Sequence, residues 1–402
     1  MTNIILFDNE TREELLPLTY LRPVSELRLG VLTIKEKWEK WLGGKVSYIT
    51  RDYLAEKFPI DYGEVNYLIN SSALPSEQLC RLIQQMEFND ALLRGEELIA
   101  AKLSESQFEH LINDEDFDDL NGYDLAGTEY IKINNLWDIF LNNHQAIKED
   151  FKLLTKGRTS QPISSTNQVI GELENIFIEE GVSMECCILN ASNGPIYIGK
   201  DATILEGSML RGPLAIGDHS VIKMGAKIYS GTTLGPYCKV GGEVKRVVFQ
   251  GYSNKGHDGY LGDSVIGRWC NIGAGANNSN LKNNYDEVKL WSYKEERFQK
   301  TGQQFCGMVL GDHSKLAISV TINTGTVIGI ACNIYGPGFP RNFVPSYSWG
   351  GAHGFTTYKT DKAFDTVERV YSRRDKAFSV EDRLILLRVF EDTARFRRWE
   401  KS

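Results

Sequence analysis

Aliphatic residues recur at a spacing of six along the second half of this chain, and that spacing limits the possible folds more than any other feature. The longest run is Ile198, Ile204, Leu210, Ile216, Ile222, Ile228, Leu234 and Val240. The spacing returns at Ile266 and Ile272, and again at Leu310, Leu316, Ile322, Ile328 and Ile334. A helix has about 3.6 residues per turn and a strand alternates every second residue, so neither keeps one face in register at this period. The period predicts a parallel β-helix, in which each hexapeptide forms one side of a coil.

The chain before the repeats has the pattern of an α/β domain. Short apolar runs predict strands at 4–7, 46–50 and 65–70. Helical spacing of apolar residues predicts helices at 31–42, 76–86 and 136–151. Because strands and helices alternate, we expect a largely parallel sheet. The acidic stretch from Asp114 to Asp119 is interpreted as a solvated loop.

Composition divides the chain into four segments. These are an α/β domain (1–155), a polar linker (156–168), the β-helix (169–345) and a C-terminal extension (346–402). A polar and aromatic insertion interrupts the repeats at 281–306. Residues 379–399 are amphipathic and predict a closing helix, with Ser379 as its N-cap.

Charge and composition exclude several classes of protein. The formal net charge is −8, whereas nucleic-acid binding needs clustered lysine and arginine. No apolar run approaches the roughly 18 residues of a membrane span. The start of the chain, MTNIILFDNETREELL, is acidic and does not read as a signal peptide. The seven cysteines are scattered and form no CxxC pair, so we expect free thiols in a cytoplasmic protein with no nucleic-acid or membrane partner.

The residues richest in chemistry lie between the repeat blocks, where 243–275 read EVKRVVFQGYSNKGHDGYLGDSVIGRWCNIGAG. This stretch resembles the acetyltransferase domain of the bifunctional N-acetylglucosamine-1-phosphate uridylyltransferase/glucosamine-1-phosphate acetyltransferase family, which makes UDP-N-acetylglucosamine. The resemblance covers roughly 200–335, and the order of the domains agrees with it. It implies a left-handed β-helix, a homotrimer and acetyl-CoA as cosubstrate.

Acetyl transfer to an amine needs a base, and His257 is the expected one. An imidazole ordinarily titrates near neutral pH, and the resemblance places His257 on the family's catalytic histidine. It also implies that the Glu243 carboxylate orients the imidazole. The two residues are distant in sequence, so only stacked coils would bring them together.

The resemblance further implies residues that bind the substrates. Lys245 aligns with a lysine that binds the sugar phosphate, and Lys227 falls where the family has an arginine. Lys227 keeps the positive charge of that arginine, but a lysine lacks the bidentate geometry of arginine. Tyr260 and Asn271 match sugar-contacting residues, and Ala274 falls where the family's backbone meets acetyl-CoA.

The sequence departs from the family after this stretch. Either Asn280 is the family's asparagine, with Leu281 in place of a tyrosine, or the motif is Asn284-Tyr285-Asp286 after an insertion. The loop that follows contains Trp291, Tyr293 and Arg297 and has no counterpart in the family, so the acceptor sugar stays open.

The first domain departs further. Sugar-nucleotide uridylyltransferases open with a Gly-rich loop that holds the triphosphate, but here Phe7 leads into Asp8-Asn9-Glu10. Asn70-Ser71 stands near the place of the family's Gly-Asp metal ligand. The domain resembles the diverged nucleotidyltransferase-like domain of some Bacteroidetes-type homologues. Arg22 and Arg28 are its candidate nucleotide-binding residues, with structural ion pairs as the alternative. Mg²⁺ and UTP are expected only if this domain is active.

These features predict an enzyme that transfers acetyl, or a related acyl group, from acetyl-CoA to an amino sugar phosphate such as glucosamine-1-phosphate. One alternative is a sugar-1-phosphate nucleotidyltransferase whose β-helix serves only assembly and regulation. Another is a non-enzymatic trimeric scaffold that presents the 281–306 loop to a protein partner.

Overall fold

The protein is described here by a computed structural model that covers residues 3–112 and 120–400. The chain divides into two compact units. The first consists of Met1–Leu15, Arg22–Leu27 and Leu32–Asn135, and the second of Leu16–Leu21, Arg28–Val31 and Leu136–Ser402. The acidic stretch that the sequence predicts to be a loop lies outside the described residues.

The first unit contains one six-stranded sheet in the order β2-β1-β3-β5-β4-β6. The three predicted strands are confirmed as β1 (Asn3–Phe7), β2 (Lys45–Ile49) and β3 (Val65–Asn70), and β1 runs parallel to both others. The remaining strands are β4 (Asp90–Arg94), β5 (Glu97–Ser104) and β6 (Asn121–Asp124). The sheet is mixed rather than largely parallel, because a tight turn at Gly95 (φ 62°) folds β5 back on β4 and β5 is also antiparallel to β3.

Two helices of this unit begin at residues that cap them. The Thr33 side chain accepts a hydrogen bond from the Glu36 amide before α2 (Ile34–Leu42), and Ser76 accepts one from Leu79 before α4 (Glu77–Gln85). Such caps satisfy amides that have no partner inside the helix. Both helices confirm the prediction. The others are α1 (Thr11–Glu14), η1 (Val24–Glu26), α3 (Asp52–Ala55) and α5 (Glu105–Ile112).

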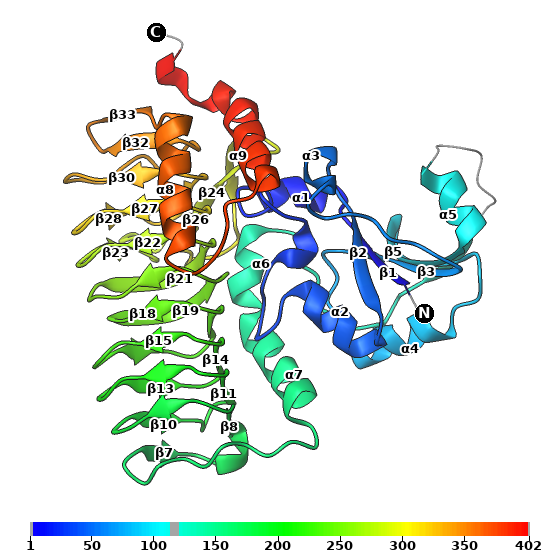
Figure 1. The fold of residues 1–402 in the computed structure, drawn as a ribbon, viewed down its shortest axis with the longest axis horizontal. Coiled ribbons are helices and arrows are strands. Elements are labelled where there is room, and N and C mark those ends of the chain that lie inside the picture. Colours follow the sequence, from blue (N-terminus) through cyan, green and yellow to red (C-terminus); the bar gives the residue numbers. More distant parts are fainter. Residues whose placement is uncertain (1–2, 113–119, 401–402) are drawn as a thin grey trace. The chain divides into compact units, whose positions relative to one another are not determined.

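The second unit is a parallel β-helix with three faces, and its coils stack in register (Figure 1). The first face contains β8 (Ile176–Ile178), β11 (Ile196–Ile198), β14 (Leu214–Ile216), β17 (Thr232–Leu234), β26 (Met308–Leu310), β29 (Thr326–Ile328) and β31 (Phe343–Val344). The second contains β9 (Ser183–Met184), β12 (Thr203–Ile204), β15 (Val221–Ile222), β18 (Lys239–Val240), β20 (Asn254–Lys255), β22 (Asn271–Ile272), β27 (Lys315–Leu316), β30 (Asn333–Ile334) and β32 (Ser348–Gly351).

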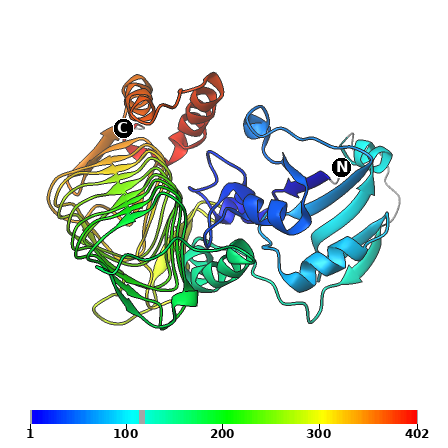
Figure 2. The same cartoon turned by 60° about the horizontal axis from the view of Figure 1, so that its bottom comes forward.

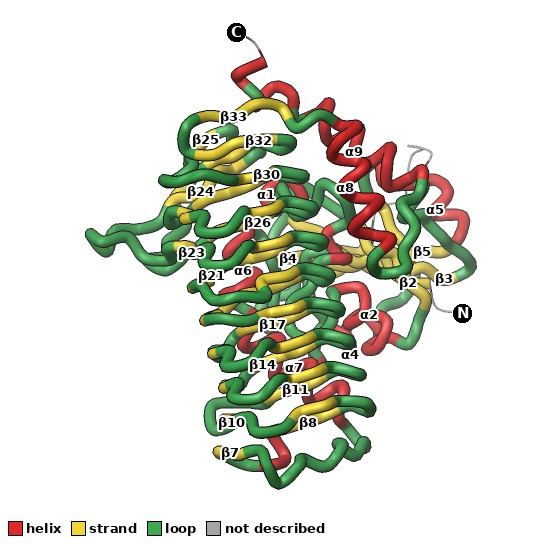
Figure 3. The backbone as a smooth tube through the Cα atoms, turned by 60° about the vertical axis from the view of Figure 1, so that its left-hand side comes forward, coloured by secondary structure: helices red, strands yellow, loops and turns green. Residues whose placement is uncertain are grey.

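The third face contains β7 (Gln168–Ile170), β10 (Ile188–Asn190), β13 (Met209–Arg211), β16 (Lys227–Ile228), β23 (Asn277–Asn278) and β28 (Thr321–Ile322). Two longer strands, β19 (Glu243–Phe249) and β21 (Tyr260–Ile266), run round a corner from the third face to the first. Figure 2 superposes the coils, and Figure 3 shows their strands stacked along the β-helix.

The aliphatic residues of the six-residue period line the core of the β-helix. All fifteen of them are at most 4% exposed. The period is interrupted between Val240 and Ile266 because three corners there are shorter than six residues. Val244, Phe249 and Leu261 nevertheless continue the inward positions and are buried.

The second unit begins earlier than the predicted domain boundary at residue 155. The predicted helix at 136–151 is two helices, α6 (Leu136–Leu141) and α7 (Asn143–Thr155), and both belong to the β-helix unit (Figure 1). α6 packs on β19 and β21, whereas α7 packs on β14 and β17. Between them the buried Asn143 side chain donates to the Gly231 carbonyl (2.8 Å) and to the Thr233 hydroxyl (3.0 Å). The predicted single helix is therefore interrupted between α6 and α7, which pack on different coils.

The predicted linker at 156–168 is irregular, but it pairs with the first coils. The Gln161 amide donates to the Ile178 carbonyl (2.8 Å), and Arg158 forms an ion pair with Glu179 (2.6 Å).

The C-terminal segment adds a hairpin and two helices to the β-helix. β32 is antiparallel to β33 (Gly354–Thr357), and α8 (Thr360–Ser372) and α9 (Val380–Asp392) follow. Ser379 accepts from the Asp382 amide (3.2 Å), which confirms it as the N-cap of α9. Short turns η3 (Ala394–Phe396) and η4 (Arg398–Glu400) end the described chain. The predicted fold class, an α/β domain followed by a β-helix with a C-terminal helix, is confirmed.

All seven cysteines are free thiols, as the sequence predicts, and only Cys186 is exposed. The described residues include no helix with the length and apolar character needed to cross a bilayer.

Candidate functional site

The third face carries a row of polar side chains across three neighbouring coils. Parallel pairing sets Lys227 of β16 beside Glu243 of β19, and Glu243 beside Tyr260 of β21. Paired strands lie about 4.8 Å apart, so these three side chains are within reach of one another. Lys227 is exposed, while Glu243 and Tyr260 are half-buried. The structure therefore brings three of the predicted site residues together.

Lys245 lies beside this row and lines a hollow of about 340 Å³ with Arg211, Tyr229 and His144. A second hollow of about 340 Å³ shares Arg211 and Tyr229 with the first and includes Lys227. Among the described residues, neither Arg211 nor the two lysines forms an ion pair. The Lys245 ammonium lies 5.7 Å from the centre of the Phe305 ring. Unneutralised cations that share a groove suit an anionic ligand such as a phosphate.

His257 lies at the corner between β20 and β21, and its side chain is exposed. The corner is bonded on both sides, because Glu243 donates its amide to the Gly259 carbonyl (3.2 Å) and Gly275 donates to the Asp258 carbonyl (2.9 Å). These bonds place His257 on the coil next to Glu243. No hydrogen bond joins the His257 imidazole to the Glu243 carboxylate in the part of the chain that the structure describes. The orienting role of Glu243 stays a prediction.

Asn280 reaches back to the row of polar side chains. Its amide nitrogen lies 3.0 Å from the Tyr260 hydroxyl and 2.5 Å from the Asp263 carboxylate. Asp263 is fully buried and also forms an ion pair with Arg246. Burial and the Asp263 charge raise the pKa of Tyr260 to about 12, so its hydroxyl remains a hydrogen-bond donor. Of the two alternatives left open by the sequence, this placement favours Asn280 as the site asparagine.

Asn271 and Ala274 lie in the next coil. Asn271 is exposed on the second face, beside Asn254 and Lys315, and so is not on the face of the polar row. Ala274 is half-buried at the corner stacked on the His257 corner, and its carbonyl accepts from Ser319 (2.8 Å). The neighbouring Ile318 is 72% exposed, so an apolar edge runs along these corners.

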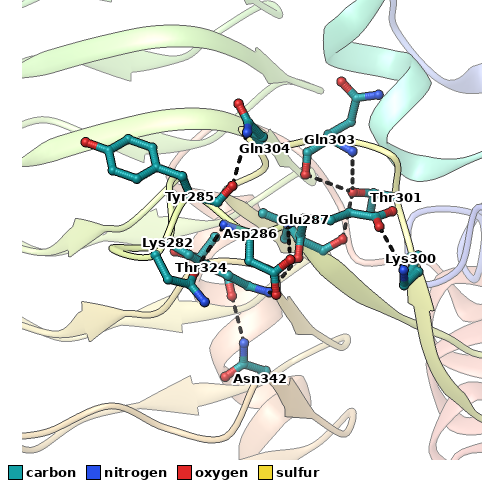
Figure 4. A network of polar contacts seen from close by, with 12 residues as sticks. Lys282, Tyr285, Asp286, Glu287, Lys300, Thr301, Gln303, Gln304, Thr324 and Asn342 are labelled. Atoms are coloured by element: carbon teal, nitrogen blue, oxygen red, sulfur yellow. Dashed lines mark hydrogen bonds and ion pairs between the residues drawn. The ribbon is translucent and has the colours of Figure 1, made fainter.

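The insertion at 281–306 forms a hairpin that is stabilised by contacts within the insertion. β24 (Lys289–Ser292) and β25 (Arg297–Lys300) pair in antiparallel fashion. Figure 4 shows the polar contacts at its base, where Glu287 pairs with Lys300 (3.3 Å) and Gln304 donates to the Tyr285 carbonyl (3.1 Å). The alternative motif, Asn284-Tyr285-Asp286, lies in this loop, and Tyr285 is 66% exposed.

The aromatic residues of the hairpin pack inward. Trp291 stacks on Phe343 with the ring centres 4.2 Å apart, and Tyr293 is buried against Phe343 and Phe396. Arg297 contacts Glu295 (3.1 Å) on the exposed side. Trp291 and Tyr293 therefore support the C-terminal packing and are not presented to a partner.

The loop after β1 in the first unit is held by a buried carboxylate. Asp8 accepts hydrogen bonds from the Thr50 hydroxyl (2.6 Å) and the Val24 amide (3.0 Å), and burial raises its pKa. Asn70 accepts from Ser72 (2.7 Å) and donates to Glu97 (3.1 Å). These side chains are committed to neighbouring protein groups, and the described residues contain no cluster of three or more metal-binding side chains.

The two candidate nucleotide-binding arginines belong to different units. Arg22 is buried in the first unit. Arg28 is buried in the second, where its amide donates to the Gln250 side chain (2.6 Å) and its guanidinium donates to the Val31 carbonyl. Arg28 therefore has a structural role in the β-helix unit.

Comparison with known proteins agrees with the two-part fold. Residues 4–159 match the family model described as sugar nucleotidyl transferase. The match spans the first unit and continues into α6 and α7 of the second. The family resemblance seen in the sequence is also confirmed, because the relatives described next are bifunctional proteins.

A bifunctional protein GlmU of Wigglesworthia glossinidia brevipalpis is 25% identical over 77% of this chain and 57% of its own length. A bifunctional sugar-1-phosphate nucleotidylyltransferase/acetyltransferase of Sulfurisphaera tokodaii is 37% identical over 35% of each chain. The chain thus spans from about a third to just over half of the length of these relatives. An Arabidopsis UDP-N-acetylglucosamine acyltransferase structure is 15% identical and covers 51% of this chain and 77% of its own, with a TM-score of 0.21, a similarity too low to carry an argument.

Sequence reasoning did not identify Arg211, Lys255 or Asp263. Arg211 precedes Tyr229 and Lys245 by one and two coils, so its outward position follows from the coil period. Asp263 and Lys255 act from buried positions, which a search for exposed polar groups does not find.

Proposed function

We propose that the β-helix transfers an acetyl group from acetyl-CoA to the amine of an amino sugar phosphate such as glucosamine-1-phosphate, with His257 as general base. The observation that carries the proposal is the row of Lys227, Glu243 and Tyr260 beside the His257 corner. Cations for a phosphate, polar groups for a sugar and an exposed imidazole lie on neighbouring coils. The similarity to bifunctional acetyltransferases supports the same function.

Each group has a distinct task in this proposal. The His257 imidazole takes a proton from the amine as its nitrogen attacks the thioester carbonyl carbon. The C–N bond forms, the C–S bond breaks, and the leaving thiolate receives the proton from the imidazolium. Lys227, Lys245 and Arg211 hold the phosphate, while Tyr260 and Asn280 contact the sugar. Glu243 orients the imidazole in the bound state.

The acetyl donor is assigned to the apolar edge at Ala274 and Ile318. Asn271 would then contact the substrates from the second face, beside this edge. We further propose that the protein acts as a homotrimer in the cytoplasm, as the family resemblance and the free thiols suggest. Ile170 and Met209 on the third face are exposed and apolar, and a neighbouring subunit would cover them. Sedimentation equilibrium should give a trimer mass.

The test is thiol release from acetyl-CoA in the presence of glucosamine-1-phosphate. His257→Ala should lower turnover by roughly 10²–10⁴, the usual contribution of a general base. His353→Ala is the matched control, because His353 is exposed in the turn between β32 and β33. Wild-type turnover in His257→Ala would contradict the assignment.

A second candidate activity rests on the family match of residues 4–159. The first unit would transfer a nucleotidyl group from UTP to a sugar-1-phosphate, with Arg22 at the nucleotide; Arg28 is left out of this proposal because it lies in the second unit. Pyrophosphate release that requires both substrates, and that His257→Ala leaves unchanged, would support it. No pyrophosphate above background would leave the first unit with a structural role.

A further inference from the structure

Lys255 occupies a position that other coils fill with an aliphatic side chain. On the second face it pairs with Val240 of β18. The corresponding inward residues of other coils are Ile204, Ile222, Val240, Ile272, Leu316 and Ile334, all at most 2% exposed except Ile272 at 4%. Lys255 is only 1% exposed. A lysine is almost never buried in this way without partners that hold its ammonium group.

The partners of Lys255 are two backbone carbonyls at neighbouring corners. Its ammonium donates to the Gly241 carbonyl (3.1 Å) and to the His257 carbonyl (2.9 Å). Gly242 leaves the space for this contact, because a Cβ there would lie 2.8 Å from the ammonium and 2.9 Å from the His257 oxygen. A buried cation thus connects two successive coils at the corner that carries the candidate base.

The corner needs the hydrogen bonds of Lys255 because its own sequence restricts the backbone conformation little. Gly256 and Gly259 flank the His257-Asp258 pair, and glycine restricts the backbone least. The bonds from neighbouring coils reach Asp258 and Gly259, but not His257. Among the described contacts, the bond from Lys255 is the one that reaches the His257 backbone.

We propose that Lys255 is a positioning residue, whose buried ammonium fixes the His257 backbone and thereby aims the imidazole at the acceptor amine. This rests on the proposed function of His257. The ammonium holds the carbonyl more firmly than a neutral amine does, since hydrogen bonds from charged donors are stronger.

The charge of Lys255 gives the proposal a pH signature. Burial lowers the pKa of Lys255 to about 8, and the Asp258 carboxylate only partly offsets this. The inward neighbours Val240 and Ile272 do not titrate, and Lys239 of β18 is exposed, which leaves Asp258 and His257 as the titratable groups at the corner. The ammonium is therefore lost as the pH rises through about 8, and turnover should decline over that range.

The experiment compares Lys255→Met, Lys255→Gln and the control Lys315→Met in the thiol-release assay between pH 6 and about 9.5. Methionine fills the core position without a donor, and glutamine retains a donor that does not titrate. Lys315 is a suitable control because burial also lowers its pKa to about 8, and it bonds the His313 carbonyl (2.7 Å) instead of the His257 corner.

Lys255→Met should lower kcat roughly 10–100-fold, the range expected from misplacing a catalytic group by about 1 Å. KM for acetyl-CoA should not change, and the decline above pH 8 should disappear. Lys255→Gln should recover part of kcat and also lack the decline. Added to His257→Ala, Lys255→Met should have no further effect on the residual rate.

The outcomes separate this proposal from the one on which it rests. If Lys255→Met keeps the kcat and pH profile of the wild type while His257→Ala is inactive, the positioning role is overturned and the base assignment stands. Equal losses in Lys255→Met and Lys315→Met would also overturn it, because they would reflect a general effect of removing a lysine from the second face. If the wild type releases no thiol, the proposed function itself fails.

Discussion

Of the three cations assigned to the phosphate, Arg211 is the one that lines both hollows on the third face. It borders both hollows of the site and forms no ion pair with a described residue. Its guanidinium can hold a phosphate by two parallel hydrogen bonds, which neither Lys227 nor Lys245 can do. Arginine is thus present in the groove, but one coil before the position at which the family resemblance implies it.

Replacement of Arg211 by alanine should therefore weaken substrate binding more than chemistry. Hydrogen bonds to charged groups contribute about 1.5–3 kcal/mol each, so we expect KM for the amino sugar phosphate to rise roughly 10–100-fold in Arg211→Ala. The value of kcat should stay within about threefold, because no bond of the phosphate forms or breaks in the acetyl transfer. Initial rates over a range of acceptor concentrations measure both constants.

Arg341→Ala is the control for this change, since Arg341 is also exposed and forms no ion pair with a described residue. A KM in Arg211→Ala equal to that of the control would remove Arg211 from the phosphate site.

At the scale of elements, the corner between the third and first faces depends on an ion pair between a buried carboxylate and a partly exposed guanidinium. Arg246 on β19 and Asp263 on β21 both have a positive φ, 53° and 48°, where the strands turn. Asp263 has no exposed side-chain surface, and its partners are Arg246 and Asn280. Removing one partner of a buried pair leaves an uncompensated charge.

We therefore expect Arg246→Ala to destabilise the protein by about 3–5 kcal/mol. Urea unfolding followed by tryptophan fluorescence measures this loss. The double variant Arg246→Ala/Asp263→Asn should recover part of it, because the stranded charge is then gone. Equal stability of the two variants would show that the pair contributes through packing of Arg246 rather than through charge.

The elements also show how far the sequence could lead. The six-residue period predicted the β-helix and its core because inward residues of parallel coils must be apolar and regularly spaced. It missed the stretch between Val240 and Ile266, where three corners are shorter and Lys255 replaces an aliphatic residue. The sequence also assigned the segment of α6 and α7 to the first domain, whereas both helices belong to the β-helix unit. Local helical spacing does not reveal which surface a helix buries. Lys227, Glu243 and Tyr260 were predicted from the family resemblance, whereas the contacts of Asn280 depend on the fold.

For the whole β-helix unit, buried lysines and buried thiols make opposite contributions to stability as the pH changes. Burial lowers the pKa of Lys255 and Lys315 from 10.5 to about 8. Between these values the unfolded chain holds protons that the folded protein has released, so a rising pH favours the folded state. Burial raises the pKa of Cys238 and Cys306 from 9.0 to about 12, and that of Cys332 to about 11. Above pH 9 the folded protein keeps protons that the unfolded chain loses, and a rising pH favours unfolding.

The free energy of unfolding should accordingly rise from pH 7.5 to about 9, by an amount on the order of 1–2 kcal/mol, and fall above it. Urea midpoints measured in the presence of a reductant at intervals across this range test the shape of the curve. In Lys255→Met/Lys315→Met the rise should disappear, while the fall should remain because the thiols are unchanged. A rise of the same size in the double variant would assign it to other groups. The same substitution that impairs the proposed positioning of His257 should thus stabilise the fold at neutral pH, because it removes a charge that burial disfavours. A Lys255→Met protein that is more stable but slower than the wild type would separate the contribution of this lysine to catalysis from its cost to folding.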